Sequence, residues 1–446
     1  MSATAVNPGR DRVLALARHA RHSSLHRNSA WIMLTIVVTS CLGYAYWVAV
    51  ARIFPAHQVG LATGLVSLMT VTAITASFGT APVLVQRLPR CDSVESWSTT
   101  LSASLVGGAV LGAVAGAVVL GALPLLSHQL AAARHDPLLA VLFVAGTIAC
   151  IASMILDYAF IAERSSRSMS SRGAIFALVK IPLVLVPALV FNVTDGTTVI
   201  FASWFAAYAI SCLLALTVLL PSVRPGFRLR VRGVGRELRG AAHMLAGNHL
   251  ITLGNALPLY LLPVIVVTRL SSTANAYFYI TWMVGGIFFM ISSSIGSSLF
   301  AEGSNDPTAI ATAARSSARL TALLLLPAML LVFVAGGWIL GLFGPAYAAH
   351  GTHLLWILAL AAIPDAITNL YVPVLRVRQR LRSAALLTMS MAAATIAAAW
   401  LVAPSLKLVG IGVVWLLGQA IGSAWVAWDI FAVRRRSARE EAACHS

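Results

Sequence analysis

Long apolar runs alternate with short polar segments along almost the whole chain. Each run holds roughly 20 to 25 residues, which is the length that a helix needs to cross a hydrocarbon layer about 30 Å thick. Backbone polar groups in lipid must be paired within the protein, so the runs predict helices, and ten-residue alternating β-strands are absent from the pattern. We expect about twelve spans, at residues 29–52, 60–84, 98–122, 138–162, 173–192, 197–220, 243–268, 275–298, 318–342, 351–375, 383–403 and 408–432.

The basic residues between these runs gather on alternate crossings. If the N-terminus lies in the cytoplasm, all but five of the 31 lysines and arginines fall at cytoplasmic ends. The positive-inside rule demands this alternation, and one missed span would scramble it. The pattern therefore predicts a multi-pass protein of the bacterial cytoplasmic membrane with both termini in the cytoplasm. The five exceptions are Arg52, Arg134, Arg269 and Lys407 on the opposite side, and Lys180 within a span.

Composition excludes other classes of protein. Hydrophobic residues make up 59% of the chain and charged residues only 10%, whereas a soluble domain carries about 25% charged residues. The net charge of +17 is explained by arginine-rich loops facing anionic membrane lipids, and no nucleic-acid-binding signature is present. The nucleotide-binding, metalloprotease and serine-hydrolase signatures are also missing, so we expect no enzyme, cofactor, metal site or catalytic residue.

The chain resembles two copies of a six-helix unit. Arg52 closes the first span and Arg269 the seventh, while Asp157 in the fourth span corresponds to Asp365 in the tenth. Weak internal repetition of this kind is typical of transporter folds, and it predicts an all-α membrane protein with two pseudo-symmetric six-helix lobes around a central cavity. The expected parts are a basic tail (1–27), an N-lobe (28–221), a basic linker (222–242), a C-lobe (243–432) and a second tail (433–446).

Charges inside the spans need a reason, because each costs at least about 2.5 kcal/mol at the bilayer centre. Asp157 and Lys180 are expected at matched depth in adjacent helices, and we predict that they pair. Such a pair is either a structural clamp or a site for ion coupling or substrate phosphate. Asp365 follows Pro364, and Asn369 lies one turn further on the same face. Asp365 is either a coupling carboxylate or a neutral cap on a helix kink.

Polar residues at two other places are candidates for binding or gating. Arg52 and Arg269 either anchor the outer interface or recognise a diphosphate or acidic sugar, because guanidinium binds phosphate in a bidentate fork. Asn248, Asn255 and Tyr260 fall in the proline-containing seventh span. Their amide and phenol groups suit sugar hydroxyls, although hydrogen bonds between helices explain them equally well.

Several segments carry a resemblance to a known family. They are Ala51 to Pro55 with Val59-Gly60, Leu84 to Arg90, Ala276 to Trp282 and Ser298 to Gly303. From about residue 28 to 432 the chain resembles the multidrug/oligosaccharidyl-lipid/polysaccharide (MOP) exporter superfamily, within it the Wzx-like oligosaccharide flippases. The resemblance implies two six-helix lobes that move lipid-linked sugars by alternating access.

The function expected from the sequence is transport. We expect a monomeric flippase that carries an undecaprenyl-diphosphate-linked oligosaccharide across the cytoplasmic membrane for polysaccharide biosynthesis, beside the glycosyltransferases and polymerase of such a pathway. Two alternatives stay open: a multidrug-type cation antiporter of the same superfamily, and a non-transporting membrane scaffold for glycosyltransferases.

Overall fold

The computed structural model describes residues 38–77, 80–230, 246–305 and 310–444, and within these ranges the chain is helical and contains no strand. Ten of the described helices are long and apolar enough to cross a membrane. The longest of them is two helices joined at Lys407, where φ is 52° and ψ is −144°. A further helix at 38–53 belongs to the first expected span, whose residues 29–37 lie outside the described ranges. The prediction of an all-helical membrane protein with about twelve spans is confirmed.

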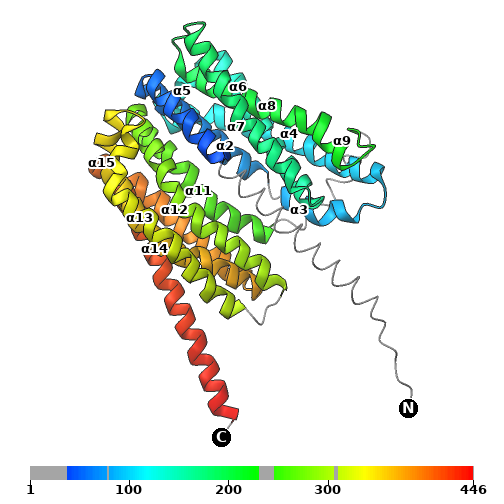
Figure 1. The fold of residues 1–446 in the computed structure, drawn as a ribbon, viewed down its shortest axis with the longest axis vertical. Coiled ribbons are helices and arrows are strands. Elements are labelled where there is room, and N and C mark those ends of the chain that lie inside the picture. Colours follow the sequence, from blue (N-terminus) through cyan, green and yellow to red (C-terminus); the bar gives the residue numbers. More distant parts are fainter. Residues whose placement is uncertain (1–37, 78–79, 231–245, 306–309, 445–446) are drawn as a thin grey trace, which may run out of the picture.

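The first half of the chain forms one group of packed helices (Figure 1). Its long members after the helix at 38–53 are α2 (Ala56–Ala76), α4 (Val94–Leu126), α6 (Pro137–Ala162), α7 (Ser166–Leu189) and α8 (Gly196–Leu214). Helix α8 continues through the π-helical turn η2 (Ala215–Leu219) into α9 (Leu220–Val223). Short connecting helices are α3 (Thr80–Arg87), η1 (Leu88–Arg90) and α5 (His128–His135).

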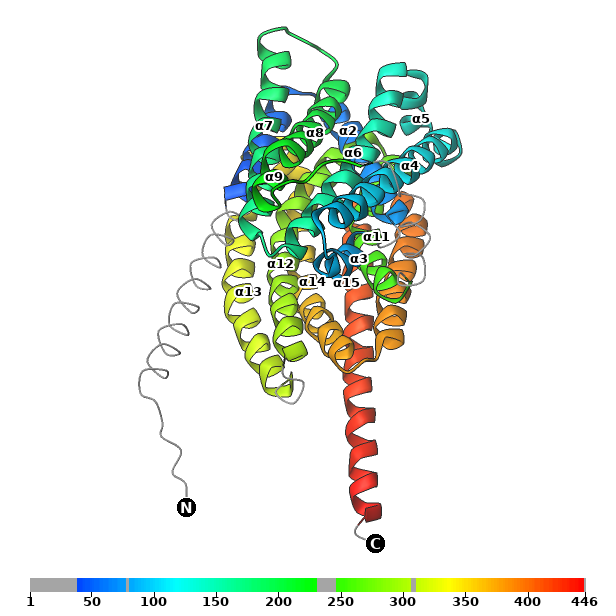
Figure 2. The same ribbon diagram turned by 90° about the vertical axis from the view of Figure 1, so that its right-hand side faces the viewer.

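The second half forms a group beside the first. Its members are α11 (Ala246–Arg269), α12 (Ser272–Asn305), α13 (Ile310–Gly341), α14 (Pro345–Val377) and α15 (Leu381–Cys444). Helix α2 of the first group packs against α11 and α12 of the second. The last part of α15 projects far from the helical body (Figure 2). We call the two groups the N-lobe and the C-lobe; the tail at 1–27 and most of the linker at 222–242 lie outside the described residues.

Some helices differ from the expected spans at their ends. The second span was expected at 60–84, but α2 ends at Ala76 and a separate helix α3 follows. The fifth and ninth were expected from residues 173 and 318, yet α7 begins at Ser166 and α13 at Ile310. Hydropathy marks only the part of a helix that lies in hydrocarbon, whereas hydrogen bonding continues the helix into polar turns. The early start of α7 changes the site described below.

Small residues let neighbouring helices approach closely. Gly108, Gly112 and Gly116 lie at four-residue spacing on α4 and face α6. A Cβ at Gly108 would lie 2.7 Å from Cδ1 of Ile155, and a Cβ at Gly112 would lie 3.0 Å from Cδ1 of Ile151. Lipid supplies no hydrophobic drive between helices, so close backbone contact of this kind holds a membrane bundle together.

The two lobes are tightly joined at the end where α2 and α12 begin. A Cβ at Gly60 would lie 1.6 Å from the carbonyl oxygen of Ser272, so only glycine fits there. Asn275 donates from Nδ2 to the carbonyl oxygen of Gly60 at 2.7 Å and to the hydroxyl of Thr63 at 3.0 Å. A buried apolar cluster spans both lobes beside these contacts. We call this end the closed face.

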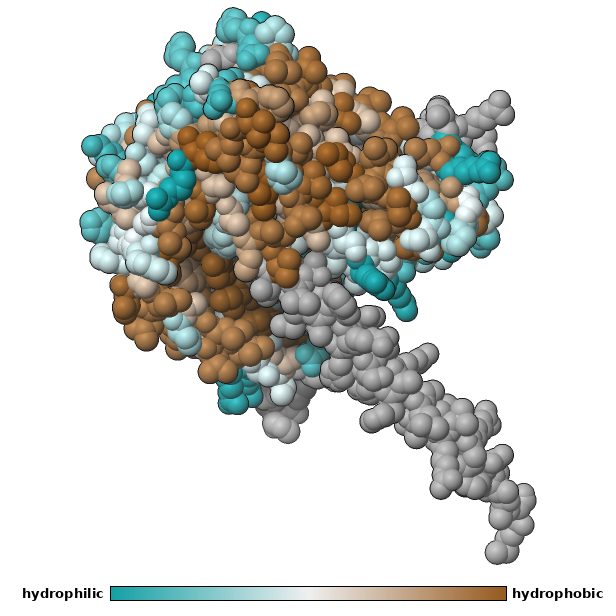
Figure 3. Space-filling model, turned by 45° about the horizontal axis from the view of Figure 1, so that its top comes forward, coloured by the Kyte–Doolittle hydropathy of each residue, from teal (hydrophilic) through white to brown (hydrophobic). Residues whose placement is uncertain are grey.

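The outer surface is apolar over much of the face shown in Figure 3, with hydrophilic residues towards its margins. Large hydrophobic side chains lie exposed on several long helices, among them Val118 at 64%, Val334 at 80% and Trp338 at 72% exposed. A soluble protein rarely exposes continuous apolar surface of this extent, whereas lipid tails solvate it. The chain is a multi-pass integral membrane protein.

Candidate functional site

A cavity of about 910 Å³ lies between the lobes. The C-lobe helices α11, α12, α14 and α15 supply most of its lining, and the N-lobe contributes the helix at 38–53, α2, α7 and α8. Two kinds of side chain share the wall. The aromatic residues are Tyr44, Trp47, Trp204, Tyr260, Tyr279, Trp282, Phe289 and Trp415, and the polar ones include Ser40, Thr252, Asn255, Ser293, Ser294, Thr368, Asn369, Thr388, Thr395 and Gln419. Lys180 and Asp365 are the charged residues among the described lining.

Lys180 enters this cavity from α7 inside an aromatic cage. Its Nζ lies 4.2 Å from the ring centroid of Trp204, 4.4 Å from that of Tyr46 and 5.0 Å from that of Phe176, and the residue is 4% exposed. The faces of aromatic rings attract a cation, most strongly where water is excluded. Among the described residues Lys180 has neither an ion-pair nor a hydrogen-bond partner, so its positive charge is held by rings alone.

The predicted pair between Asp157 and Lys180 is wrong. Arg172 of α7 binds Asp157 of α6 instead, from Nε to Oδ1 at 2.7 Å and from Nη2 to Oδ2 at 2.5 Å. Because α7 begins at Ser166, Arg172 lies inside the helix and within reach of α6. Lys180 lies about two turns further along α7 and faces the cavity. This bidentate contact clamps two N-lobe helices together, and neither residue lines the cavity.

Asp365 lies in a polar cluster on the C-lobe side. Its Oδ2 accepts hydrogen bonds from the Ser292 hydroxyl at 2.9 Å and from Nδ2 of Asn369 at 2.8 Å, and the residue is 6% exposed. Thr368 donates to the Asp365 carbonyl oxygen and lies 3.4 Å from Oε1 of Gln419. Within the described residues no lysine or arginine pairs with this carboxyl group. The cluster therefore offers oxygen atoms and one acid facing the cavity, which suits a proton or a small cation.

The other sequence candidates fall at three places. Asn255 and Tyr260 line the large cavity. Asn248 lies in α11, but its side chain is outside the described residues. Arg52 crosses between lobes at the closed face, donating to the carbonyl oxygens of Leu342 at 2.9 Å and Gly341 at 3.1 Å, whereas Arg269 contacts Trp400 of its own lobe.

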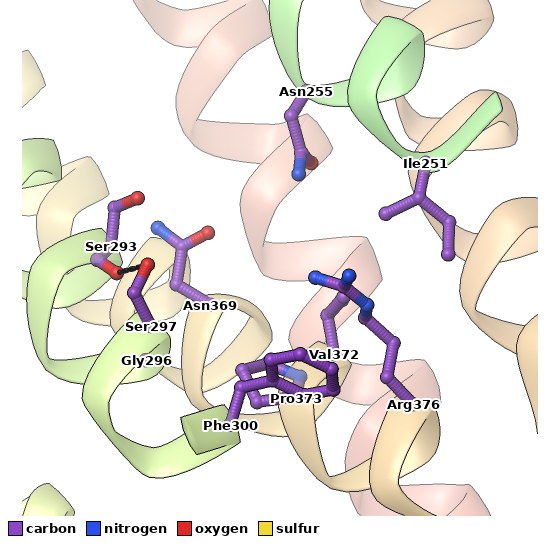
Figure 4. Close-up of a pocket in the computed structure, with 10 residues that line it drawn as sticks. All are labelled: Ile251, Asn255, Ser293, Gly296, Ser297, Phe300, Asn369, Val372, Pro373 and Arg376. Carbon is purple, nitrogen blue, oxygen red and sulfur yellow. Dashed lines mark hydrogen bonds between the residues drawn. The ribbon is translucent and has the colours of Figure 1, made fainter. Parts of the chain in front are cut away.

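A second, smaller cavity of about 150 Å³ adjoins the large one. Asn255, Ser293, Asn369 and Val372 line both, and the smaller cavity extends along α12 and α14 to Arg376 (Figure 4). Phe300 forms its far wall, with the Arg376 guanidinium carbon 4.2 Å from the ring centroid. The combined space thus reaches towards the end of α14, away from the closed face.

The sequence did not single out the aromatic lining, nor Arg172 and Arg376. Trp47, Trp204, Trp282 and Trp415 come from four different helices, so no local pattern marks them as one wall. Arg172 and Arg376 each lie one residue outside the expected spans at 173–192 and 351–375, whereas the structure places both inside helices.

Comparison with solved structures shows which known proteins have a similar fold. No family model and no curated protein matches the sequence. The lipid II flippase MurJ, in an inward closed conformation, shows 9% identity and a TM-score of 0.71 over 90% of this chain and 87% of that one. An inward-facing multidrug resistance MATE family transporter shows 13% identity and a TM-score of 0.66 over 91% and 99%. An outward-facing transporter of that family shows 15% identity and a TM-score of 0.58 over 92% and 96%. The chain therefore has the fold of the MOP superfamily transporters, as its sequence resemblance predicted.

Proposed function

We propose that the protein is a flippase for a lipid-linked oligosaccharide with an anionic head group, undecaprenyl diphosphate being the expected carrier. The head group would occupy the 910 Å³ cavity while the prenyl tail stays in lipid, and rocking of the lobes would exchange access between the two faces. Three features of the described cavity wall support this proposal: the buried lysine Lys180, the aromatic and polar side chains, and a carboxyl group that is available for coupling.

We further propose that the arginine-rich ends of the helices face the cytoplasm, as the positive-inside rule predicts. The lobes are joined at the opposite, closed face by Arg52, Gly60 and Asn275. The higher TM-score against the inward-facing MATE transporter than against the outward-facing one supports the same assignment. In this orientation the cavity accepts substrate from the inner leaflet.

The lone ammonium group of Lys180 is the observation that carries the proposal. Burying a charge without an opposite charge is costly in free energy. A role in binding substrate would explain why a lysine lies at this position. The aromatic cage holds the amino group of Lys180 beside the cavity and brings no negatively charged group to it. An anionic group of the substrate would complete the missing ion pair. A cationic drug would be repelled at the same point.

The rest of the wall suits a carbohydrate. Asn255, Ser293 and Gln419 line the cavity with amide and hydroxyl groups, which can exchange hydrogen bonds with sugar hydroxyls. Trp282 and Trp415 line it with indole rings. Their ring faces would cover the apolar faces of the sugar rings.

We also propose Asp365, with Asn369 and Ser292, as the coupling site. The carboxyl group faces the cavity and is held by hydrogen bonds rather than by a cation. A proton or sodium ion that binds there would remove one negative charge from the cavity before an anionic head group enters. The cost of bringing two negative charges into one low-dielectric space links the two events.

Binding to the purified protein in nanodiscs tests the role of Lys180. Tryptophan fluorescence is a suitable signal, because Trp47 and Trp204 line the cavity. We expect a prenyl-diphosphate oligosaccharide to bind wild type, Lys180→Arg to retain binding, and Lys180→Met to weaken it at least about tenfold, the loss of one charge-assisted contact. Equal affinity in Lys180→Met and wild type would remove Lys180 from substrate recognition.

The second candidate function is a multidrug-type cation antiporter. The carboxyl group of Asp365 favours this function, because it has no lysine or arginine partner among the described residues and a carboxylate in a cavity attracts cationic drugs. The same nanodisc assay separates the two proposals: an antiporter would bind ethidium more tightly in Lys180→Met, where the repelling charge is gone, and would lose ethidium in Asp365→Asn. The scaffold alternative and the glycosyltransferase partners remain predictions from the sequence.

A further inference from the structure

We propose that the short helix α5 is a clasp over the closed face, which holds the C-lobe through Gln129 and Leu130 and releases both residues when this face opens. The clasp goes beyond the proposed function, and its role in transport rests on that function, because an alternating-access protein has to open this face. Helix α5 joins α4 to α6 and therefore belongs to the N-lobe. It lies at the end of the molecule away from the projecting part of α15 (Figures 1 and 2).

Gln129 caps a helix of the opposite lobe. Its Oε1 accepts a hydrogen bond from the backbone N–H of Ser272, the first residue of α12, at 2.7 Å. The first N–H groups of a helix have no partner within the helix, so oxygen atoms from elsewhere satisfy them. Ser271 supplies another such oxygen, because its hydroxyl accepts from the N–H of Ala274 at 3.0 Å. One cap of α12 thus comes from its own chain end and one from the N-lobe, and separation of the lobes at this face removes the second.

Leu130 adds an apolar contact beside this hydrogen bond. The residue is 0% exposed and belongs to a buried cluster that also contains Val264 and Val267 of α11. A Cβ built on Gly64 of α2 would lie 2.8 Å from Cγ2 of Val267 and 3.5 Å from Cδ2 of Leu130. Side chains of α5 and α11 therefore meet over the same glycine of α2. Because α5 and α11 belong to different lobes, an opening of the closed face exposes the apolar surface of Leu130.

The ends of α5 are suited to hinge motion. Ser127 separates it from α4 in an extended conformation, with φ −161° and ψ 127°, and Asp136 separates it from α6 with φ −89° and ψ 108°. The Ser127 hydroxyl accepts from the N–H of Leu130 at 3.4 Å, and Oδ1 of Asp136 accepts from the N–H of Leu138 at 2.9 Å. Hinges are a few residues at the ends of elements that absorb changes in backbone angle. A rotation at Ser127 and Asp136 would move α5 without unwinding α4 or α6.

Two substitutions of Gln129 should change the clasp in opposite directions. Gln129→Ala removes the oxygen atom that caps α12. Gln129→Glu keeps an oxygen atom there and adds a negative charge at the positive end of the α12 dipole, which strengthens the hydrogen bond. The amide nitrogen of Gln129 has no hydrogen-bond partner among the described residues, so Gln129→Glu loses no contact. A residue that served folding alone would not give changes of opposite sign.

Distances between spin labels at His57 and Ala349 measure the opening of the closed face in nanodiscs. The substitutions are made in Arg52→Ala protein, in which the open population is expected to be large enough for a decrease to be seen. We expect Gln129→Ala to raise the ratio of open to closed protein about two- to tenfold, the effect of one hydrogen bond, and Gln129→Glu to lower it. Arg134→Ala is the matched control, because Arg134 lies on α5 and is exposed.

A reversible cross-link tests whether release of the clasp is a step in transport. In a background without native cysteines, Gln129→Cys and Ser272→Cys are joined by a short bifunctional thiosulfonate reagent. We expect movement of a prenyl-diphosphate oligosaccharide across the bilayer to stop and to return after reduction. The matched control joins Gln58→Cys to Thr194→Cys, because the Gln58 amide donates to the Thr194 carbonyl oxygen at 3.1 Å within the N-lobe. This second cross-link should leave the movement unchanged.

Three results would overturn the clasp. They are an unchanged ratio of open to closed protein in folded Gln129→Ala, the same direction of change in Gln129→Ala and Gln129→Glu, and undiminished movement of the oligosaccharide while α5 is cross-linked to α12. Failure of the proposed function looks different: no oligosaccharide would cross the membrane even without a cross-link, while the spin-label distances would still change in opposite directions.

Discussion

Arg52 is expected to hold the lobes together at the closed face. Its guanidinium group bonds the carbonyl oxygens of Gly341 and Leu342, at the end of α13 in the other lobe, at 3.1 and 2.9 Å. A cation at the C-terminal end of a helix also meets the negative end of the helix dipole. An opening of this face breaks both bonds. Arg52→Ala should therefore destabilise the closed arrangement without touching the cavity.

The magnitude follows from these contacts. Each hydrogen bond contributes about 0.5–1 kcal/mol, the lower part of the usual range, because Arg52 is exposed and competes with water. The total of about 1–2 kcal/mol shifts a two-state equilibrium by roughly 5- to 30-fold. A state that is open at this face and populated at about 1% in wild type would rise to roughly 5–20% in Arg52→Ala.

Distance measurements between spin labels check this shift. Labels at His57 and Ala349, both exposed and in different lobes near the closed face, report the separation in a background without the five native cysteines. Arg269→Ala is the matched control, because the hydrogen bond and the ring contact of Arg269 are both made to Trp400 of its own lobe. If the distance distribution of Arg52→Ala were the same as those of wild type and of Arg269→Ala, Arg52 would not hold the lobes together.

Three further predictions concern stability and coupling. Asp157→Ala should lower the free energy of unfolding by about 3 kcal/mol, because it leaves Arg172 buried and unpaired, and thermal unfolding should show partial recovery when Arg172→Met is added; no loss would refute the clamp. Gly60→Ala should lower the melting temperature, because its Cβ would lie 1.6 Å from the backbone oxygen of Ser272. Gly286→Ala should not, because a Cβ there would have no atom within 4 Å. Equal changes in melting temperature would contradict the close packing at the closed face. Asp365→Asn keeps the side-chain volume and removes the charge, so substrate transport should lose its dependence on the proton or sodium gradient, and a retained dependence would place the coupling elsewhere.

The sequence predicted the fold because the physics of the bilayer acts on long segments. An apolar run of about 20 residues has the length of a helix that crosses the lipid layer, so few other structures are available to it. The alternation of arginine-rich ends then gives the number of spans. Asp365 with Asn369 was also found as a unit, since one helical turn separates the two residues. Local spacing is sufficient for contacts of this kind.

The sequence did not predict which residues meet between distant helices. The pairing of Asp157 with Arg172 depended on where α7 begins, and hydropathy placed that point seven residues too late. The cage around Lys180 depends on Tyr46 of the helix at 38–53, which lies far from α7 in the chain, and a single sequence does not show that these helices meet. Arg52 and Arg269 have matching places in the two halves but different contacts, because Arg52 bonds across the lobes and Arg269 bonds Trp400 within its own lobe.

Transbilayer movement in proteoliposomes tests the central claim most directly. The vesicles would contain a prenyl-diphosphate oligosaccharide with a fluorescent glycan, and a membrane-impermeant quencher would report the leaflet in which it lies. The account predicts that wild-type protein moves the glycan between leaflets, and that Lys180→Met slows this movement while Lys180→Arg does not. Movement at the rate of protein-free vesicles, together with gradient-driven uptake of ethidium by the same preparation, would contradict it.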